Sequence, residues 1–277
     1  MERQPDRDPE RDREAFAWQT GVWDRMSDVY IREIDRRFAS VVDVVLARAA
    51  VREGERVLDL GTGTGAVALK TAGLVGPEGE VVAVDISPRM LALAERRARE
   101  RGLSNVRVRE GRAELLPIAD ASCDAVLASL SLMYIIDRAA AAAEIARVLR
   151  PGGRLVAAVW AGPEWCDIVR FQQIAGSFAP EPPVPGVGPG SLADPAPFRG
   201  QLVAVGIATD VETETLGFNF DSFAAAWDAL ASVTAAQLAP DRLQAAQAAT
   251  FAAMYPDGDG PRHFRNETLF IVGTRDA

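Results

Sequence analysis

The 277-residue sequence is poor in the residues that build metal centres and covalent cross-links. It contains one histidine, His263, two cysteines, Cys123 and Cys166, and one lysine, Lys70. A single histidine excludes every metal site that needs two histidine ligands, and we expect no metal. Two cysteines are too few for a disulfide framework or a four-thiolate zinc site, and they suit a reducing compartment. One lysine leaves a single candidate for Schiff-base or P-loop chemistry.

Positive charge is also scarce. The 30 arginine and lysine residues face 39 acids, which gives a net charge of −9. This field repels a phosphate backbone, so we expect no nucleic-acid partner. No run approaches the about 20 apolar residues of a transmembrane helix, so we also expect no membrane span. Residues 1–14 are charged, with two prolines and no apolar stretch, which predicts a disordered tail, no targeting signal and a cytoplasmic protein.

Hydrophobic periodicity predicts an α/β fold. A helical pattern precedes residue 54, and short apolar strands then alternate with helices, which is typical of a parallel sheet covered on both faces. After Trp160 the alternation stops, and seven prolines between 180 and 197 predict a long loop of the kind that forms lids. The strands are expected at 56–60, 80–85, 106–109, 124–129, 154–160, 208–220 and 267–274.

The same pattern divides the chain into five parts. We expect a disordered N-terminus at 1–14, a helical cap at 15–53, a ligand-binding core at 54–160, a lid with the proline-rich loop and a helix at 161–206, and the end of the sheet at 207–277 with a helical insertion at 221–255.

The most informative motif is VLDLGTGTG at 57–65. Its glycines let the backbone turn sharply after a strand, and the following helix points free N–H groups at a ligand. Gly61, Gly63 and Ala66 also satisfy the dinucleotide fingerprint. Asp85 ends the second strand, twenty positions after Gly65, where a carboxylate can accept hydrogen bonds from both hydroxyls of a ribose. The sequence therefore favours an adenosine-containing ligand.

Five segments in order carry a resemblance to a known family: VLDLGTGTG at 57–65, VVAVDIS at 81–87, REGRAELLPIADASCDAVLAS at 109–129, LMYIID at 132–137 and RVLRPGGRL at 147–155. Together they resemble the class I S-adenosylmethionine-dependent methyltransferases, in the group of ubiquinone/menaquinone C-methyltransferases. The resemblance implies a Rossmann-like, seven-stranded, mostly parallel sheet with an antiparallel last strand, helices on both faces, and S-adenosyl-L-methionine as cofactor. The segments outside 56–159 resemble the group more loosely.

The resemblance also implies cofactor contacts at the positions that match the family motifs. The methionine part of the cofactor would lie against the glycine loop and the end of the fourth strand, under a lid residue from the cap; these positions are Gly61, Thr62, Gly63, Gly65, Ser129 and Tyr30. Asp59 would hold the loop and the cofactor's amino group, and Asp85 would hold the ribose. The adenine would lie among Ile86, Met90 and the backbone of Ala113.

One position departs from the family pattern. Before Ala113 the family usually has an acid that receives the adenine amino group, and this sequence has Arg112. Because arginine cannot accept a hydrogen bond, the adenine must be recognised by the backbone, by Glu114 or by stacking on the guanidinium.

The remaining aromatic residues point to the acceptor. All five tryptophans, at positions 18, 23, 160, 165 and 227, lie outside the first four strands and their helices, in segments expected to cover the ligand edge of the sheet. This predicts an apolar pocket for a small hydrophobic or aromatic molecule that is methylated on carbon or oxygen, in quinone or secondary metabolism. His263 is the first candidate base, because its pKa suits proton transfer near neutrality and it precedes the last strand. Tyr134 is the second.

Two other functions stay open on the sequence. An NAD-dependent dehydrogenase would share the fold, although Asp59 before the glycines and the RVLRPGG segment at 147–153 argue against it. A protein that binds S-adenosylmethionine and transfers no methyl group would carry the same motifs, because they encode binding and not turnover.

Overall fold

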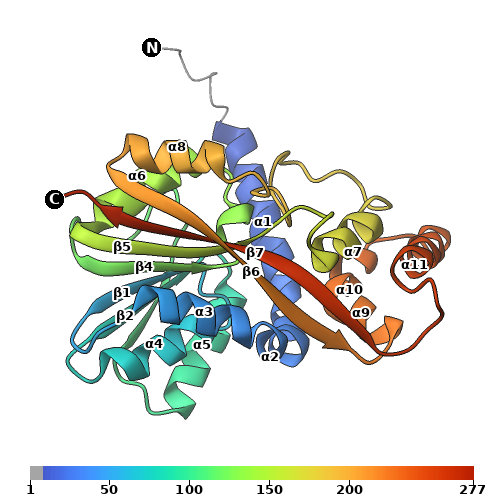
Figure 1. Cartoon of the computed structure of the whole chain (residues 1–277), viewed down its shortest axis with the longest axis horizontal. Coiled ribbons are helices and arrows are strands. Elements are labelled where there is room, and N and C mark those ends of the chain that lie inside the picture. The colour runs from blue at the N-terminus through green and yellow to red at the C-terminus, as the bar shows by residue number, and fades with distance from the viewer. Residues whose placement is uncertain (1–8) are drawn as a thin grey trace.

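The computed structural model describes residues 9–277 (Figure 1). These residues form a seven-stranded sheet with the order β3-β2-β1-β4-β5-β7-β6. The first five strands are parallel, and β7 runs antiparallel to both of its neighbours. The predicted fold class is confirmed. The strands are β1 Arg56–Leu60, β2 Glu80–Asp85, β3 Val106–Glu110, β4 Cys123–Ser129, β5 Leu149–Trp160, β6 Ile207–Phe220 and β7 Arg262–Arg275.

The central strands are buried on both faces, which explains their continuous apolar runs. Nearly every residue of β1, β2 and β4 is buried, whereas the edge strand β3 is mostly exposed. Charged side chains at Arg107, Arg109 and Glu110 keep that open edge from pairing with another strand. The sheet is therefore rigid at the strand ends that carry the glycine loop and Asp85.

Helices cover both faces of the sheet (Figure 1). One face carries α3 Ala39–Ala49, α4 Ala66–Val75 and α5 Pro88–Glu100, and the other carries α6 Arg138–Val148 and α8 Ala196–Ala204. The start of α5 follows the sequence signals, because Ser87 Oγ accepts a hydrogen bond from Met90 N at 3.1 Å and Pro88 fills the first helical position. No helix within residues 9–277 is both long and apolar enough to cross a membrane.

The N-terminal segment differs from its prediction. Helix α1 spans Pro9–Val29, so residues 9–14 are helical and only 1–8 of the predicted disordered tail lie outside the described residues. Arginine and glutamate are good helix formers, and α1 packs against α5. The chain continues through the short π-helix η1 Tyr30–Ile34 and the short α2 Asp35–Arg37. We call α1, η1 and α2 the cap.

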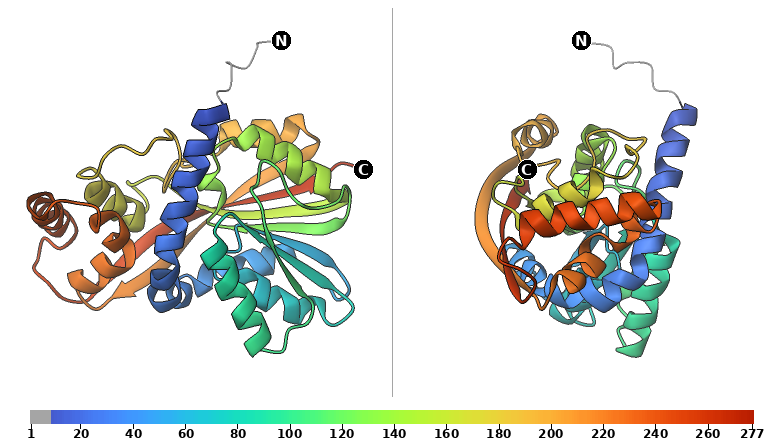
Figure 2. Two further views of the ribbon diagram at one scale, coloured as in Figure 1. Left: turned by 180° about the vertical axis from the view of Figure 1, so that it is seen from behind. Right: turned by 90° about the vertical axis from the view of Figure 1, so that its right-hand side faces the viewer.

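The C-terminal part extends beyond the core. Strands β6 and β7 pair along their whole length, from Ile207 with Arg275 to Phe220 with Arg262, and the far end of this ribbon carries a side lobe (Figures 1 and 2). The side lobe consists of α7 Asp167–Gly176, α9 Phe223–Leu230, α10 Ser232–Ala235 and α11 Pro240–Met254. In the left view of Figure 2, α1 crosses in front of the junction of the sheet and this lobe.

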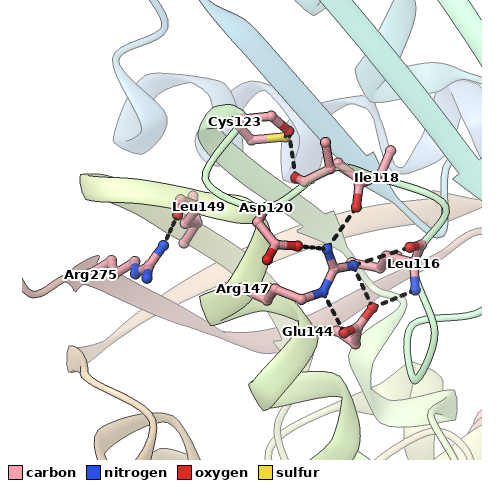
Figure 3. A network of polar contacts seen from close by, with 10 residues as sticks. Leu116, Ile118, Asp120, Cys123, Glu144, Arg147, Leu149 and Arg275 are labelled. Carbon is pink, nitrogen blue, oxygen red and sulfur yellow. Dashed lines mark hydrogen bonds and ion pairs between the residues drawn. The ribbon is translucent and has the colours of Figure 1, made fainter.

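An arginine of the RVLRPGGRL motif fastens the loop that follows β3 (Figure 3). The guanidinium of Arg147 donates to Glu144 at 2.7 and 2.8 Å, to Asp120 at 2.6 Å, and to the carbonyl oxygens of Ile118 and Leu116 at 2.7 and 3.1 Å. The hydrogen-bonded carboxylate of Glu144 raises the pKa of Arg147 above its ordinary value. The segments 109–129 and 147–155 are therefore joined by direct hydrogen bonds in the fold.

Candidate active site

A cavity lies between the carboxyl ends of β1, β2 and β4 and the cap. It encloses about 1070 Å³ of space between protein atoms, which includes open solvent at its mouth. Its position is the one at which open α/β sheets bind ligands.

The glycine loop forms the floor of this cavity. Gly61, Gly63 and Gly65 all have left-handed backbone, with φ of 73°, 54° and 88°, which other residues adopt only at a cost. The N–H groups of Gly61 and Thr62 both donate to Val84 O at 2.9 Å. This ties the loop to the end of β2, and the space beside Gly63 stays open to a ligand.

Asp59 braces the loop from behind. Its carboxylate accepts hydrogen bonds from Thr62 Oγ1 at 2.7 Å and from Ala68 N at 2.9 Å, so it joins the loop to the first turn of α4. Burial raises the pKa of Asp59 to about 7, although the two hydrogen bonds act in the opposite direction. The side chain does not line the cavity, so a contact with the cofactor's amino group stays a prediction.

The raised pKa of Asp59 makes the free energy of unfolding depend on pH, and Asp59→Asn tests this dependence. An acid whose pKa rises on folding stabilises the protein at low pH, and this contribution is lost as the pH rises through about 7. Between pH 5 and pH 8 the loss is about 3 kcal/mol, which is about two pKa units at about 1.36 kcal/mol each. We expect urea unfolding to show Asp59→Asn gaining about that much relative to the wild type over this range. Asp28→Asn, at a side chain 71% exposed, should show no such trend, and a constant difference for Asp59→Asn would contradict the assignment.

Asp85 faces the cavity at the end of β2. Its two carboxylate oxygens accept hydrogen bonds from Gly63 N at 2.8 Å and Ser87 N at 2.9 Å, and each oxygen keeps a further lone pair. Burial raises the pKa of Asp85, and the nearby carboxylate of Asp24 adds to the effect. The carboxylate is therefore fixed in place and still able to accept hydrogen bonds from two ligand hydroxyls.

Beyond Asp85 the cavity is lined by Ile86, Met90, Ala113, Arg112 and Glu114. The Arg112 guanidinium lies 4.4 Å from the ring centre of Phe16 on α1, a cation–π arrangement. Glu114 Oε1 accepts hydrogen bonds from the backbone N–H groups of residues 136 and 137 at 3.1 and 3.2 Å. Arg112 thus presents a flat cation, already stacked on one ring, at the end of the cavity expected to hold adenine.

Aromatic side chains line the end of the cavity nearest Trp23. Trp23 of α1 makes edge contacts with Tyr30 at 5.9 Å and with Tyr134 at 4.7 Å between ring centres. Tyr134 belongs to the 3-10 turn η2 Leu132–Tyr134, and its carbonyl oxygen accepts a hydrogen bond from the Gln19 side chain of α1. Ser129, at the end of β4, also lines this end.

Acidic residues of the cap attach it to the core. Asp24 accepts a hydrogen bond from Ser87 Oγ at 2.6 Å. Asp35 pairs with Arg97 of α5 and accepts a hydrogen bond from Thr64 Oγ1 at 2.7 Å. Both contacts lie beside the cavity and hold the cap over its mouth.

Comparisons with known proteins agree with this geometry. A family model described as a methyltransferase domain matches residues 52–169. The ubiquinone/menaquinone biosynthesis C-methyltransferase UbiE of Serratia proteamaculans is 34% identical over 166 residues, which are 60% of this chain and 64% of that protein. The demethylmenaquinone methyltransferase of Geobacillus kaustophilus is 37% identical over 147 residues, 53% of this chain and 62% of that protein. The chain spans less than two thirds of the length of these relatives.

The core of the chain is therefore similar to methyltransferase domains. Solved structures share its fold. A putative methyltransferase from Bacillus halodurans has a TM-score of 0.64 at 21% identity and covers 86% of this chain and 100% of its own. The cyclase SpnF has a TM-score of 0.57 at 23% identity, with 86% of this chain and 81% of its own covered.

The cavity brings together most of the predicted site residues. They are Tyr30, Gly61, Thr62, Gly63, Asp85, Ile86, Met90, Arg112, Ala113, Ser129 and Tyr134. Asp59, behind the loop, and Gly65, at its end, do not line the cavity.

His263 is the exception. The expectation that it precedes the last strand is wrong, because β7 begins at Arg262 and His263 lies within it, paired with Asn219. Its exposed ring packs across Gly217, with Nδ1 2.8 Å from Asn219 Oδ1. The ribbon carries this position past the carboxyl edge of the sheet, and His263 does not line the cavity.

The residues missed by sequence reasoning are those that close the cavity from the cap. Gln19, Trp23 and Asp35 line it, but they come from a helical segment without a motif. Only Trp23 carried a signal, through the clustering of tryptophans outside the core strands.

Proposed function

We propose that the chain transfers a methyl group from S-adenosylmethionine to carbon or oxygen of a small hydrophobic or aromatic acceptor, such as a quinone precursor. The observation that carries the proposal is one continuous cavity that Asp85, the glycine loop and three aromatic rings line together. The names of the curated relatives support the class of acceptor.

The residues fit the cofactor. Asp85 keeps acceptor capacity for the ribose, the open space at Gly63 admits a ligand against the backbone, and Ile86 and Met90 offer apolar walls to a purine. When bound, S-adenosylmethionine supplies an electrophilic methyl group on a positively charged sulfur. The cap residues exclude water from that group and hold the acceptor in line with it, and alignment of this kind accounts for much of the rate of a displacement reaction.

Labelled methyl transfer tests the proposal. The protein is incubated with S-adenosylmethionine that carries a deuterated methyl group and with a panel of quinols, phenols and thiols, and products are followed by mass spectrometry. We expect a product heavier by one labelled methyl group, suppressed by excess S-adenosylhomocysteine. If S-adenosylmethionine binds and no acceptor in the panel gains a methyl group, the protein binds the cofactor without methyl transfer.

A further inference from the structure

The turn η2 forms part of the wall of the cavity. Leu132 and Met133 are buried, whereas Tyr134 lines the cavity and its ring makes an edge contact with Trp23 of the cap. A 3-10 turn has poorer hydrogen-bond geometry than an α-helix and little strength of its own. The groups that bind the carbonyl oxygens of η2 therefore determine where the Tyr134 ring lies.

One guanidinium collects oxygens from η2 and from a distant segment. Arg138, in the first turn of α6, donates to Leu132 O at 3.3 Å and to Met133 O at 3.0 Å. It also donates to Gly186 O at 2.9 Å and to Ser191 Oγ at 2.7 Å, both in the segment between α7 and α8. A guanidinium can serve several acceptors at once because it carries five N–H donors in a fixed plane. Burial lowers the pKa of Arg138, but arginine stays charged in proteins.

The segment between α7 and α8, residues 177–195, is the proline-rich loop, and it also binds η2 directly. Gly188 N donates to Met133 O at 3.0 Å, and Ser191 Oγ donates to the same oxygen at 2.7 Å. Met133 O thus accepts three hydrogen bonds, with Arg138 as the third donor. The position of η2 therefore depends on the loop that Arg138 holds.

The cap binds the last residue of the same turn. The Gln19 side chain donates to Tyr134 O, and the centres of the Trp23 and Tyr134 rings are 4.7 Å apart. Gln19 and Trp23 both belong to α1, and both line the cavity. The turn η2 therefore joins the proline-rich loop to the cap, and a displaced η2 would disturb both contacts of α1.

We infer that Arg138 is a positioning residue for the proposed methyl transfer. It holds η2 between the proline-rich loop and the cap, and it thereby sets the places of Tyr134 and Trp23 in the acceptor pocket, although Arg138 itself does not line the cavity. The inference rests on the proposed function and names the device that shapes this pocket. Asp85 and the glycine loop are held by other contacts, at the ends of β1 and β2. A change at Arg138 should therefore reach the acceptor and spare the cofactor.

Three variants test the inference in steady-state kinetics. Arg138→Gln removes the charge and most of the donors, Arg138→Lys keeps the charge with three donors, and Ser191→Ala removes one donor to Met133 O. The acceptor is the one that the wild type methylates in the panel of quinols, phenols and thiols. We expect Arg138→Gln to raise the KM of this acceptor by about 10-fold or more, with the Kd of S-adenosylhomocysteine unchanged within a few-fold. Arg138→Lys should recover part of the loss, and Ser191→Ala should show a smaller loss of the same kind.

Tryptophan fluorescence follows η2 without an acceptor. The spectrum of each protein, minus that of the same protein with Trp23→Phe, reports the surroundings of the Trp23 indole. Because the Tyr134 ring lies against this indole, Arg138→Gln should move the Trp23 emission to longer wavelength when S-adenosylhomocysteine is bound.

The matched control is Arg199→Gln. Arg199 of α8 donates to Thr209 O of β6 at 2.7 Å and does not line the cavity, so this variant loses an arginine–carbonyl contact elsewhere. Its acceptor KM and its Trp23 emission should equal those of the wild type. An unchanged Trp23 emission in Arg138→Gln, or equal changes in Arg199→Gln, would overturn the inference and leave methyl transfer standing. If the wild type methylates no acceptor, the proposed function falls, and the Trp23 emission alone decides whether Arg138 positions η2.

Discussion

Gly61→Ala is expected to lower the free energy of unfolding by about 3 kcal/mol or more and to weaken S-adenosylmethionine binding by more than 100-fold. The backbone at Gly61 is left-handed, with φ of 73°, which costs an alanine about 1–2 kcal/mol. An added Cβ would also stand 2.4 Å from Ser131 Cβ, and Ser131 is held in place by its hydrogen bond to Leu60 O at 2.7 Å. The loop must therefore move, and it forms the floor of the cavity. Urea unfolding and isothermal titration measure the two effects.

Gly54→Ala separates backbone strain from the clash. Gly54 is also left-handed, with φ of 80°, but nothing lies within 4 Å of its added Cβ. It should cost about 1 kcal/mol and leave cofactor affinity unchanged. If Gly61→Ala behaves like Gly54→Ala in both measurements, the loop is not held as tightly as its contacts with Ser131 and Val84 imply.

Asp85→Ala is expected to weaken S-adenosylmethionine binding by about 1–3 kcal/mol, or about 5- to 150-fold, because the ribose loses a charged acceptor. Asp85→Asn should be nearly as damaging. Both carboxylate oxygens accept backbone N–H groups, from Gly63 and Ser87, so an amide NH₂ at this position would have to face one of those donors. Isothermal titration gives the affinities.

The control for Asp85 is Asp28→Ala, which removes a carboxylate from the same region at an exposed ion pair with Arg89. It should bind S-adenosylmethionine like the wild type. An unchanged dissociation constant for Asp85→Ala would place the ribose elsewhere in the cavity.

The sequence predicts well what local pattern determines. The glycine loop and Asp85 follow from strand, turn and helix signals within thirty residues of each other, and the first five strands lie within a few residues of their predicted places because each is a short apolar run between turns. The parallel order of these strands then brings their carboxyl ends to one edge without further information. This is why most predicted cofactor positions meet in one cavity.

The predictions from sequence fail where packing between distant segments determines the local structure. Residues 9–14 are highly charged, and the sequence therefore predicts a disordered tail. They are instead the first turns of α1, a helix that packs on α5. The mostly polar residues 262–266 do not have the pattern of a strand. Pairing with β6 along the whole ribbon nevertheless makes them part of β7. His263 therefore lies on the ribbon and not at the cavity. The contact of Asp35 with Thr64 and Arg97 joins three segments, and no single stretch of sequence carries its signature.

The most direct test of the central claim is a crystal structure of the protein soaked in S-adenosylmethionine. The account predicts the adenosyl group in the cavity beside residues 59–65, with both ribose hydroxyls within hydrogen-bond distance of the Asp85 carboxylate and the sulfur turned toward Tyr30 and Tyr134. A cavity that stays empty under saturating ligand, or a ribose held by groups other than Asp85, would contradict it.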